Sequence, residues 1–370
     1  MQKHIVLHLM ILALFITACN GDDDKEEGTS LPENLQIQTE VSATEAGKVN
    51  VSATAVNAKF FTVDFGEPGS TTTSINGTAS YTYTKSGTYT IEVKAHATSN
   101  EFISKTTQVE VVIPEPPISD EGYTTPDSYD GYTLEWQDEF DGESVNTSNW
   151  TFELGTGSNG WGNNELQFYR AENTSVKDGY LIITAKKENF SGREYTSSRM
   201  VTRGKQEFQY GRVDIRALLP KGQGVWPALW MLGANHPEVP WPACGEIDIM
   251  EKIGGTGNEN KVYGTLHWDH EGAHACTCDK PAYTLPDGIF NDKFHVFTIT
   301  WDSENIKWYV DDVLFNTIDI TPGGLSEFHE KFFFIFNVAV GGDWPGSPDA
   351  STVFPQRMIV DYIRVFKPQE

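Results

Sequence analysis

The chain has 370 residues, of which 38% are hydrophobic, so it is long enough to hold two domains with substantial cores. Its formal net charge of -25 at pH 7 argues against nucleic acid or an anionic membrane surface as the binding partner, because both attract basic proteins. A neutral or cationic partner is expected instead.

The N-terminus reads as an export signal. Residues 1–18 contain an apolar run shorter than the ~20 residues that span a bilayer, which predicts a secretory signal peptide. The sequence Ile16-Thr17-Ala18-Cys19 resembles a bacterial lipobox, and this implies that Cys19 is acylated after cleavage. The lipid alone is then expected to anchor the protein to the outer membrane at the cell surface, and the acidic residues 19–30 are expected to form a tether between the lipid and the folded domains. The alternative is a plain signal peptide with a chance cysteine.

Residues 31–113 are predicted to form a small immunoglobulin-like β-sandwich. All ten tryptophans lie at position 136 or later, which marks a sharp compositional boundary. Before this boundary, alternating runs such as Ala79-Ser-Tyr-Thr-Tyr-Thr and Gly87-Thr-Tyr-Thr-Ile-Glu-Val-Lys are typical of antiparallel strands. The segment resembles the polycystic-kidney-disease type of module found in bacterial polysaccharide enzymes, for which a spacer role is expected.

A linker and a larger β domain are predicted to follow. Residues 114–130 are rich in proline and have little to bury, which indicates a stiff linker. Over residues 131–368 the apolar runs are short and bounded by turns, and no long helical periodicity is present, so an all-β sandwich is expected. Within it, Asp311-Asp312 separates two alternating runs and predicts a hairpin with a two-residue turn.

The cysteines allow few covalent links. Without Cys19 the chain keeps Cys244, Cys276 and Cys278, an odd number for an exported protein. We expect at most one disulfide, which would join Cys244 to either Cys276 or Cys278. Zinc binding by Cys276 and Cys278 near His274 is the alternative, but the one-residue spacer and the lack of a second pair favour a surface loop.

Three carboxylates fall within six residues, at Glu246, Asp248 and Glu251. On an unbroken strand Glu251 would face away from the other two. We predict a β-bulge at residues 249–250 that returns Glu251 to their face while Ile247 stays in the core. Mutual repulsion would then keep one carboxyl protonated and another ionised, as a retaining glycosidase requires of two carboxyls about 5 to 5.5 Å apart. The alternative is a strand with a solvated acidic face.

Tryptophans lie close to this acidic stretch in the sequence. Trp226 and Trp230 precede it, and Trp241 leads directly into it. Flat aromatic faces suit the C–H faces of sugar rings. Each tryptophan taken alone is more often a core residue, but the cluster favours sugar binding.

Eight motifs follow one another from about Tyr132 to Phe366, and together they resemble a family 16 glycoside hydrolase of the laminarinase type. The motifs are WQDEFDG, GWGNNELQFY, DGYLIITA, GVWPALWMLG, WPACGEIDIME, GTLHW, FNVAVGGDWPG and VDYIRVF. The resemblance implies a β-jelly-roll catalytic domain that needs no cofactor for its chemistry. It also implies that Glu246 is the nucleophile, Asp248 its hydrogen-bonding assistant and Glu251 the acid/base.

The resemblance further implies substrate-binding residues and a structural metal site. The residues expected to line the cleft are Asn164, Arg199, Trp226, Trp230, Trp241, His267 and Asn337. A structural calcium is expected at Glu139, the carbonyl of Gly179 and Asp361, because Ca²⁺ binds carboxylate and carbonyl oxygens. The alternative is that Glu139 and Asp361 are solvated or hydrogen-bonded to backbone.

These observations lead to one main functional hypothesis and two alternatives. The main hypothesis is a monomeric, retaining endo-β-glucanase that cuts β-1,3-glucan or mixed-linkage β-1,3/1,4-glucan. One alternative is a surface glycan-binding lipoprotein without turnover, against which the intact acidic motif argues. The other keeps the chemistry but changes the polymer to agarose, carrageenan or xyloglucan, and the spacing that requires a bulge argues against this one.

Overall fold

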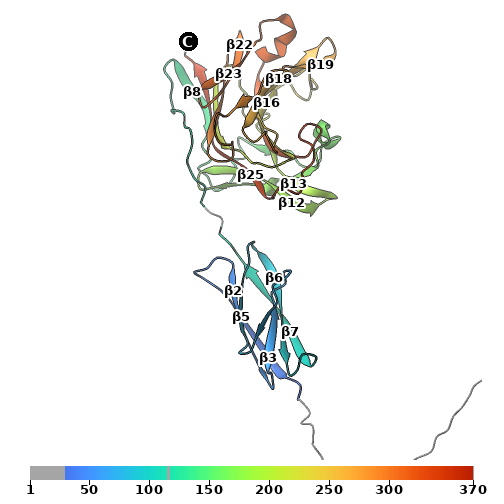
Figure 1. Cartoon of the computed structure of the whole chain (residues 1–370). Coiled ribbons are helices and arrows are strands. Elements are labelled where there is room, and N and C mark those ends of the chain that lie inside the picture. The colour runs from blue at the N-terminus through green and yellow to red at the C-terminus, as the bar shows by residue number, and fades with distance from the viewer. Residues whose placement is uncertain (1–29, 115–116, 370) are drawn as a thin grey trace, which may run out of the picture. The chain divides into compact units, whose positions relative to one another are not determined.

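The computed structural model describes residues 30–114 and 117–369. It separates into an N-terminal unit that ends at Pro117 and a C-terminal unit that begins at Ile118 (Figure 1). The predicted signal peptide and Cys19 lie outside the described residues. Within the described ranges, no helix is long and apolar enough to cross a membrane.

The N-terminal unit is a β-sandwich of two antiparallel sheets, as its alternating runs predict. One sheet has the strand order β1 (Glu33–Val41), β2 (Lys48–Val56) and β5 (Thr78–Thr82). The other has the order β4 (Thr72–Ser74), β3 (Phe60–Asp64), β6 (Gly87–His96) and β7 (Phe102–Val111). Alternate residues such as Val49 and Val51 of β2 are buried against Ile91 and Val93 of β6, so period-two patterning builds the core.

The predicted linker over residues 114–130 is shorter in the structure, because the chain from Ile118 onward packs on the C-terminal unit. Arg216 is buried there, and its guanidinium donates hydrogen bonds to the Asp120 carboxylate at 2.6 Å and to the Tyr123 carbonyl at 2.7 Å. A buried charge needs such partners. Composition alone does not reveal that this proline-rich segment supplies them.

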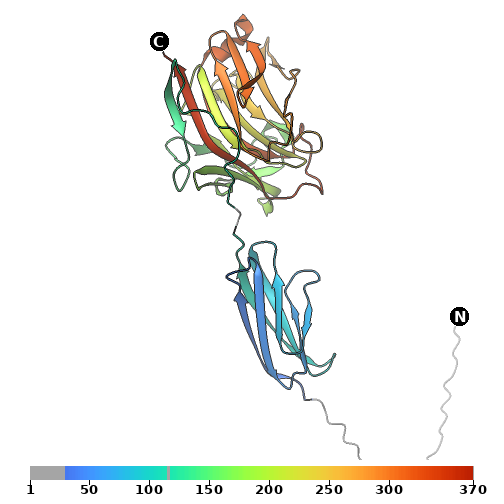
Figure 2. The same cartoon turned by 60° about the vertical axis from the view of Figure 1, so that its left-hand side comes forward.

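The C-terminal unit consists of two large sheets that face each other across one hydrophobic core (Figures 1 and 2). The first sheet follows the order β10 (Gln167–Tyr169), β13 (Arg193–Ser197), β12 (Tyr180–Phe190), β25 (Gln356–Pro368), β15 (Gly211–Leu218), β21 (His295–Trp301), β22 (Asn305–Val310) and β23 (Val313–Asp319). Two strands join it off this path: β11 (Thr174–Lys177) on β12 and β8 (Tyr132–Asp138) on β25. This is the all-β architecture that the short apolar runs predict.

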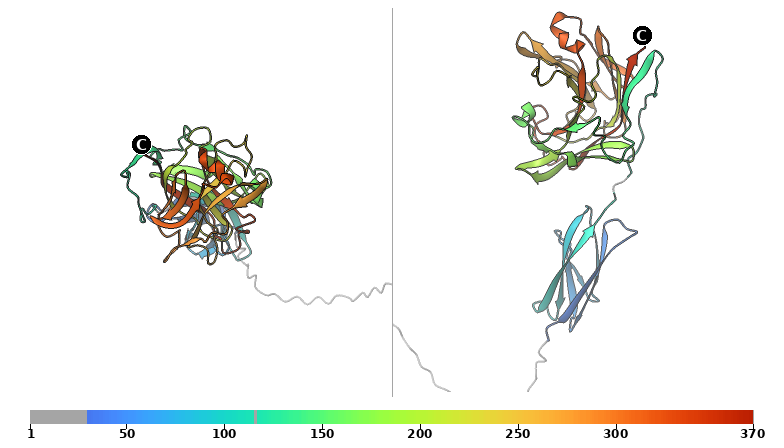
Figure 3. Two further views of the ribbon diagram at one scale, coloured as in Figure 1. Left: turned by 90° about the horizontal axis from the view of Figure 1, so that it is seen from above. Right: turned by 180° about the vertical axis from the view of Figure 1, so that it is seen from behind.

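The second sheet carries the acidic stretch. Its order is β19 (Ala273–Cys276), β18 (Lys261–His270), β17 (Glu246–Glu251), β16 (Val225–Gly233), β24 (Phe332–Val340), β14 (Arg199–Val201) and β9 (Thr151–Phe152), with β20 (Tyr283–Thr284) paired to β18. The helical segments are short: η1 (Gly160–Asn164), η2 (Ala171–Asn173) and η3 (Gly323–His329). Figure 3 shows the C-terminal unit in two further views. The acidic strand β17 therefore lies between β16 and β18, away from the edges of the sheet.

The apolar sequence of β24 explains its central place in the second sheet. All nine residues of this strand are buried, which fits a near-continuous apolar run rather than an alternating one. The predicted hairpin is also confirmed, because Val310 of β22 pairs with Val313 of β23 across Asp311 and Asp312. Both turn residues have positive φ, 52° and 60°, as a type I′ turn requires.

The disulfide prediction was wrong. The bond joins Cys276 to Cys278, two residues apart. Cys244 is free and fully buried, in a small cluster with Leu232 and Phe333. The odd number of cysteines correctly limits the protein to one disulfide, but the sequence does not show that Cys244 is enclosed by apolar side chains.

Candidate active site

The predicted β-bulge is present in β17. Against β16, Met250 pairs with Leu229 and Asp248 pairs with Trp230, so Ile249 has no partner of its own. The register with β18 shifts at the same place, between Asp248 and Glu251. The apolar residues of the strand, Ile247, Ile249 and Met250, all belong to the core. The three acidic side chains consequently share the opposite face.

Each carboxyl group on this face has a polar neighbour from another part of the chain. The Trp241 indole donates a hydrogen bond to Glu246 Oε2 at 2.8 Å, and the Trp226 indole donates to Glu251 Oε1 at 3.0 Å. His267 Nε2 lies 3.2 Å from Asp248 Oδ2 and 3.8 Å from Glu246 Oε1. Three residues that the sequence assigned to the cleft therefore contact the acidic group directly.

The backbone of β17 is also held from the core side. The indole of Trp308, from β22 in the facing sheet, donates a hydrogen bond to the carbonyl of Asp248 at 2.7 Å. The approach requires glycine at position 264 of β18, because a Cβ there would lie 2.3 Å from the Trp308 ring. This hydrogen bond links the two sheets and fixes the backbone of β17 at Asp248, between the two glutamates.

The electrostatics of the site favour protonated carboxyl groups. Burial, reinforced by the Asp248 charge, raises the pKa of Glu246 to about 8. Burial raises the pKa of Asp248 to about 7, and burial together with the charges of Asp248 and Glu246 raises the pKa of Glu251 well above its usual range. At neutral pH the site therefore retains protons that isolated carboxyl groups would release, which supplies an acid next to a potential nucleophile.

Three further predicted cleft residues form a second group beside the acids. Trp230 donates its indole N–H to Asn337 Oδ1 at 2.7 Å, and the Asn337 amide donates to the Tyr169 hydroxyl at 3.1 Å. The Arg199 guanidinium lies over the Trp230 ring, 4.8 Å from its centroid, and pairs with Glu153 at 2.6 Å. These contacts fix the orientation of Trp230, which directly neighbours Asp248 across the strand pair.

The remaining predicted residue, Asn164, is hydrogen-bonded to Asp343 rather than to a member of either group. It ends the η1 segment in an exposed position, and its amide donates hydrogen bonds of 3.0 Å to both carboxylate oxygens of Asp343. The carboxylate of Asp343 thus orients the side chain of Asn164.

Similarity to known proteins identifies the family to which this fold and this acidic site belong. The model of glycosyl hydrolases family 16 matches residues 163–364, more than half of the chain. The chain belongs to this family. Its predicted jelly-roll fold is confirmed by similarity to the solved structure of the laminarinase catalytic domain from Thermotoga maritima MSB8 in complex with cetyltrimethylammonium bromide. That match has a TM-score of 0.60 at 47% identity and covers 65% of this chain and 99% of that chain.

Two relatives give the extent of the sequence similarity. Over 250 residues this family 16 chain is 40% identical to the beta-glucanase of Rhodothermus marinus. The matched region covers 64% of this chain and 85% of that protein. Over 239 residues it is 42% identical to the clotting factor G alpha subunit of Tachypleus tridentatus, and this match also covers 64% of this chain. The match spans only 34% of that subunit, about a third of its length.

The sequence reasoning missed several polar and aromatic residues of this family 16 site. Glu165 is buried and accepts hydrogen bonds from Gln167 at 2.6 Å and from the Tyr169 hydroxyl at 3.1 Å. Trp344 packs edge-on against Trp226 with ring centroids 5.5 Å apart, and it is 41% exposed. Both Glu165 and Trp344 lie within quoted motifs, GWGNNELQFY and FNVAVGGDWPG, so their motif membership was the available signal.

The residues expected to hold calcium have other partners. Both carboxylate oxygens of Glu139 accept hydrogen bonds from Arg364, at 2.6 and 2.8 Å. Asp361 Oδ2 accepts one from the buried Arg216 at 2.7 Å. Two guanidinium groups thus neutralise both carboxylates, and a calcium ion at this position would have to displace them.

Proposed function

We propose that this protein is a retaining endo-β-glucanase that hydrolyses β-1,3-glucan, such as laminarin, or mixed-linkage β-1,3/1,4-glucan. The observation that carries the proposal is the pair Glu246 and Glu251, brought to one face by the bulge, each accepting a hydrogen bond from an indole. The similarity to a beta-glucanase and to a laminarinase catalytic domain supports this substrate class.

The chemistry follows from the raised pKa values of the three carboxyl groups. Glu251 holds its proton at neutral pH and donates it to the leaving glycosidic oxygen. Glu246 attacks the anomeric carbon as a carboxylate. Because the pKa of Glu246, about 8, lies above that of Asp248, about 7, the proton that the two groups share must pass from Glu246 to Asp248 before the attack. Water, deprotonated by Glu251, then hydrolyses the glycosyl-enzyme. No step needs a cofactor.

The exposed indole of Trp241 provides a surface for a sugar ring beside the nucleophile. This side chain is 45% exposed while its N–H is bound to Glu246, so the ring face is available and its orientation is fixed. A sugar stacked on this face would bring its anomeric carbon toward Glu246.

Product analysis on a panel of polymers tests the proposed function. Chromatography after incubation with laminarin, mixed-linkage glucan, agarose and carrageenan is expected to show oligosaccharides from one or both β-glucans. Binding to β-glucan without products would favour the non-catalytic glycan-binding alternative. Products from agarose or carrageenan alone would move the chemistry to another polymer, and either result would overturn the proposal.

Hydrolysis is expected to proceed with net retention of anomeric configuration. Two displacements at one carbon restore its configuration, so fresh product should be the β-anomer. A covalent intermediate should also be intercepted by sugar, which gives transglycosylation at high oligosaccharide concentration. Proton NMR of the first products measures the anomer directly. An α-anomer appearing first would mean that water attacks the glycan without a glycosyl-enzyme.

The substitution Asp248→Asn is expected to move the whole pH profile of kcat/KM to lower pH. The Asp248 charge adds to the effect of burial in raising the pKa values of Glu246 and Glu251, so its removal lowers both. Activity requires ionised Glu246, which sets the acid limb, and protonated Glu251, which sets the alkaline limb. Both limbs should therefore shift in the same direction. Unmoved limbs in the variant would show that burial alone sets these pKa values.

Export and anchoring are also part of the proposed function. We propose that the protein is a lipoprotein acylated at Cys19 and displayed on the outer membrane. The polycystic-kidney-disease-like module would act as a spacer, and the protein would be a monomer. The lipobox-like residues and the acidic run after them support this proposal. Mass spectrometry of the membrane-extracted protein tests it: an acylated N-terminal cysteine is expected, and a Cys19→Ala variant should be released from the membrane fraction.

Structural calcium at Glu139, the Gly179 carbonyl and Asp361 stays a prediction. Binding would require the ion to replace the guanidinium of Arg364 at Glu139 and that of Arg216 at Asp361. An ion that binds only the folded state raises the melting temperature. The expected result is a higher melting temperature of the chelator-treated protein when millimolar calcium is added. An unchanged value would retire calcium at this position.

A further inference from the structure

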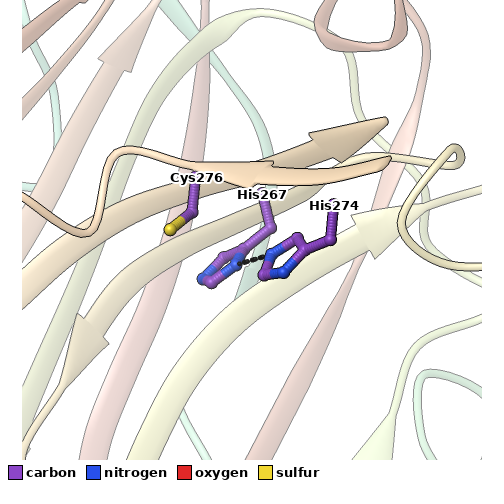
Figure 4. A group of neighbouring side chains, drawn as sticks. All are labelled: His267, His274 and Cys276. Atoms are coloured by element: carbon purple, nitrogen blue, oxygen red, sulfur yellow. Dashed lines mark hydrogen bonds between the residues drawn. The ribbon is translucent and has the colours of Figure 1, made fainter. Parts of the chain in front are cut away.

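Two histidines and a cysteine converge at the β18–β19 hairpin, next to the acidic group. His267 of β18 pairs directly with Cys276 of β19, and His274 lies two residues before Cys276, so all three side chains project from the same face. His267 Nδ1 and His274 Nε2 are 2.9 Å apart, and the Cys276 sulfur lies with them within 4.8 Å (Figure 4). The two imidazole rings are stacked, 10° from parallel.

Imidazole nitrogen and thiolate sulfur are the ligand atoms that Zn²⁺ prefers. Zinc binds them at about 2.0 to 2.1 Å and 2.3 Å, so ligand atoms around one ion are separated by distances similar to those found here. His267 also has the second contact typical of a metal-bound histidine, because its Nε2 faces the Asp248 carboxylate at 3.2 Å. That carboxylate oxygen is buried, and no hydrogen bond from another described residue satisfies it, so it is available to accept from Nε2. With Nε2 protonated toward Asp248, Nδ1 is left as the metal ligand.

The disulfide controls the third ligand. While Cys276 is bonded to Cys278, its sulfur is not a thiolate and cannot bind zinc in that form. An external dithiol supplies two electrons and two protons to the S–S bond, which breaks into two thiols while the dithiol becomes a disulfide. The Cys276 thiol then loses its proton to solvent as it binds the ion. Cys244, which is free in the oxidised protein too, is enclosed in an apolar cluster.

We infer that His267, His274 and Cys276 form a binding site for Zn²⁺ that is completed when the Cys276–Cys278 disulfide is reduced. Nothing in this inference depends on the proposed function, because binding of the ion can be measured on its own. Its consequence for activity does depend on that function.

A bound ion would lie beside the groups that act on substrate. His267 neighbours Asp248 and Glu246, and the ring of His274 packs against Trp241 with centroids 4.7 Å apart. Zinc would thus hold in place two imidazoles that contact the nucleophile, its assistant and the exposed indole. We expect reduced, zinc-loaded protein to hydrolyse β-glucan at least about tenfold more slowly than the same protein without metal.

The substitution Cys278→Ser separates metal binding from reduction, because it leaves Cys276 as a thiol without any reductant. Calorimetry of the full chain with Zn²⁺ should show one site in this variant, and Co²⁺ should give the charge-transfer absorption of a cobalt–thiolate bond. Adding His274→Gln should weaken zinc binding at least about 10- to 100-fold, the range by which even outer-shell changes reduce metal affinity. The matched control is His270→Gln, an exposed histidine on β18 outside this cluster, which should leave the affinity unchanged.

Three outcomes would overturn the inference. One is equal zinc affinity of the oxidised and dithiol-reduced wild-type protein, measured after anaerobic removal of the dithiol. The second is zinc affinity that His274→Gln does not change. The third is a cobalt spectrum that keeps its thiolate band after Cys276→Ser is added to Cys278→Ser.

The test does not depend on a single substitution. If Cys278→Ser fails to fold, the reduced wild-type protein can be used in its place. If the protein proves not to hydrolyse glucan, only the inhibition assay is lost, and the binding measurements still decide.

Discussion

Replacing Glu246 or Glu251 by Gln is expected to lower kcat on β-glucan by roughly 10²- to 10⁴-fold or more in each case. Glu246→Gln removes the carboxylate that forms the glycosyl-enzyme, and Glu251→Gln removes the group that donates a proton in the first step and accepts one in the second. Both variants keep the shape of the side chain, so the indole contacts from Trp241 and Trp226 can persist through the amide oxygen. Initial rates on laminarin measure the effect.

An activated aryl glycoside separates the two roles. A good leaving group departs without protonation, so Glu251→Gln should still form the glycosyl-enzyme while Glu246→Gln should not. Azide should then rescue Glu251→Gln and give a β-azide product, because it attacks from the face opposite to the nucleophile. An α-azide from the Glu251 variant would reverse the assignment of the two glutamates.

A matched substitution tests whether the loss is specific. Glu238 lies in an exposed turn between β16 and β17 and takes part in neither indole contact of the site, so Glu238→Gln should keep wild-type activity. Equal loss in Glu238→Gln would point to a general effect of removing negative charge rather than to the chemistry of the two glutamates.

The local geometry of the acidic stretch was predictable because it depends on one strand. Side-chain alternation and the need to bury Ile247 already require an irregularity between Asp248 and Glu251, and the bulge is found at Ile249. The hairpin at Asp311 was predictable for the same reason, since alternation and turn chemistry are encoded in adjacent residues.

The contacts that hold the site together were less predictable, because they join residues far apart in the chain. Trp230 and Asn337 were assigned by motif, but the hydrogen bond between them spans 107 positions, and the link from Asn337 to Tyr169 spans 168. The same limit applies to the contacts of the residues predicted to hold calcium. Nothing near Glu139 in the sequence indicates that Arg364, 225 positions away, binds both of its oxygens.

Breaking a buried ion pair at the end of the acidic strand should strongly destabilise the C-terminal unit. Lys252 follows Glu251, is fully buried, and its ammonium contacts the Glu259 carboxylate and the Pro220 carbonyl. Glu259 Oε1 also accepts the backbone N–H groups of Gly222 and Gly255, at 2.7 and 2.8 Å. The pair therefore ties the end of β17 to two loops.

Glu259→Gln is expected to destabilise the protein by about 3 to 5 kcal/mol, because it leaves the Lys252 ammonium buried without a counter-charge. For a domain of this size, each kcal/mol lowers the melting temperature by about 2 to 4 °C, so a decrease of roughly 6 to 20 °C is expected by calorimetry. The double variant Lys252→Met, Glu259→Gln removes the unpaired charge while the Gln oxygen can still accept from Gly222 and Gly255. It should therefore melt above Glu259→Gln alone. A wild-type melting temperature for Glu259→Gln would contradict the prediction. So would a double variant that is no more stable than Glu259→Gln, because the destabilisation would then not come from the unpaired Lys252 ammonium.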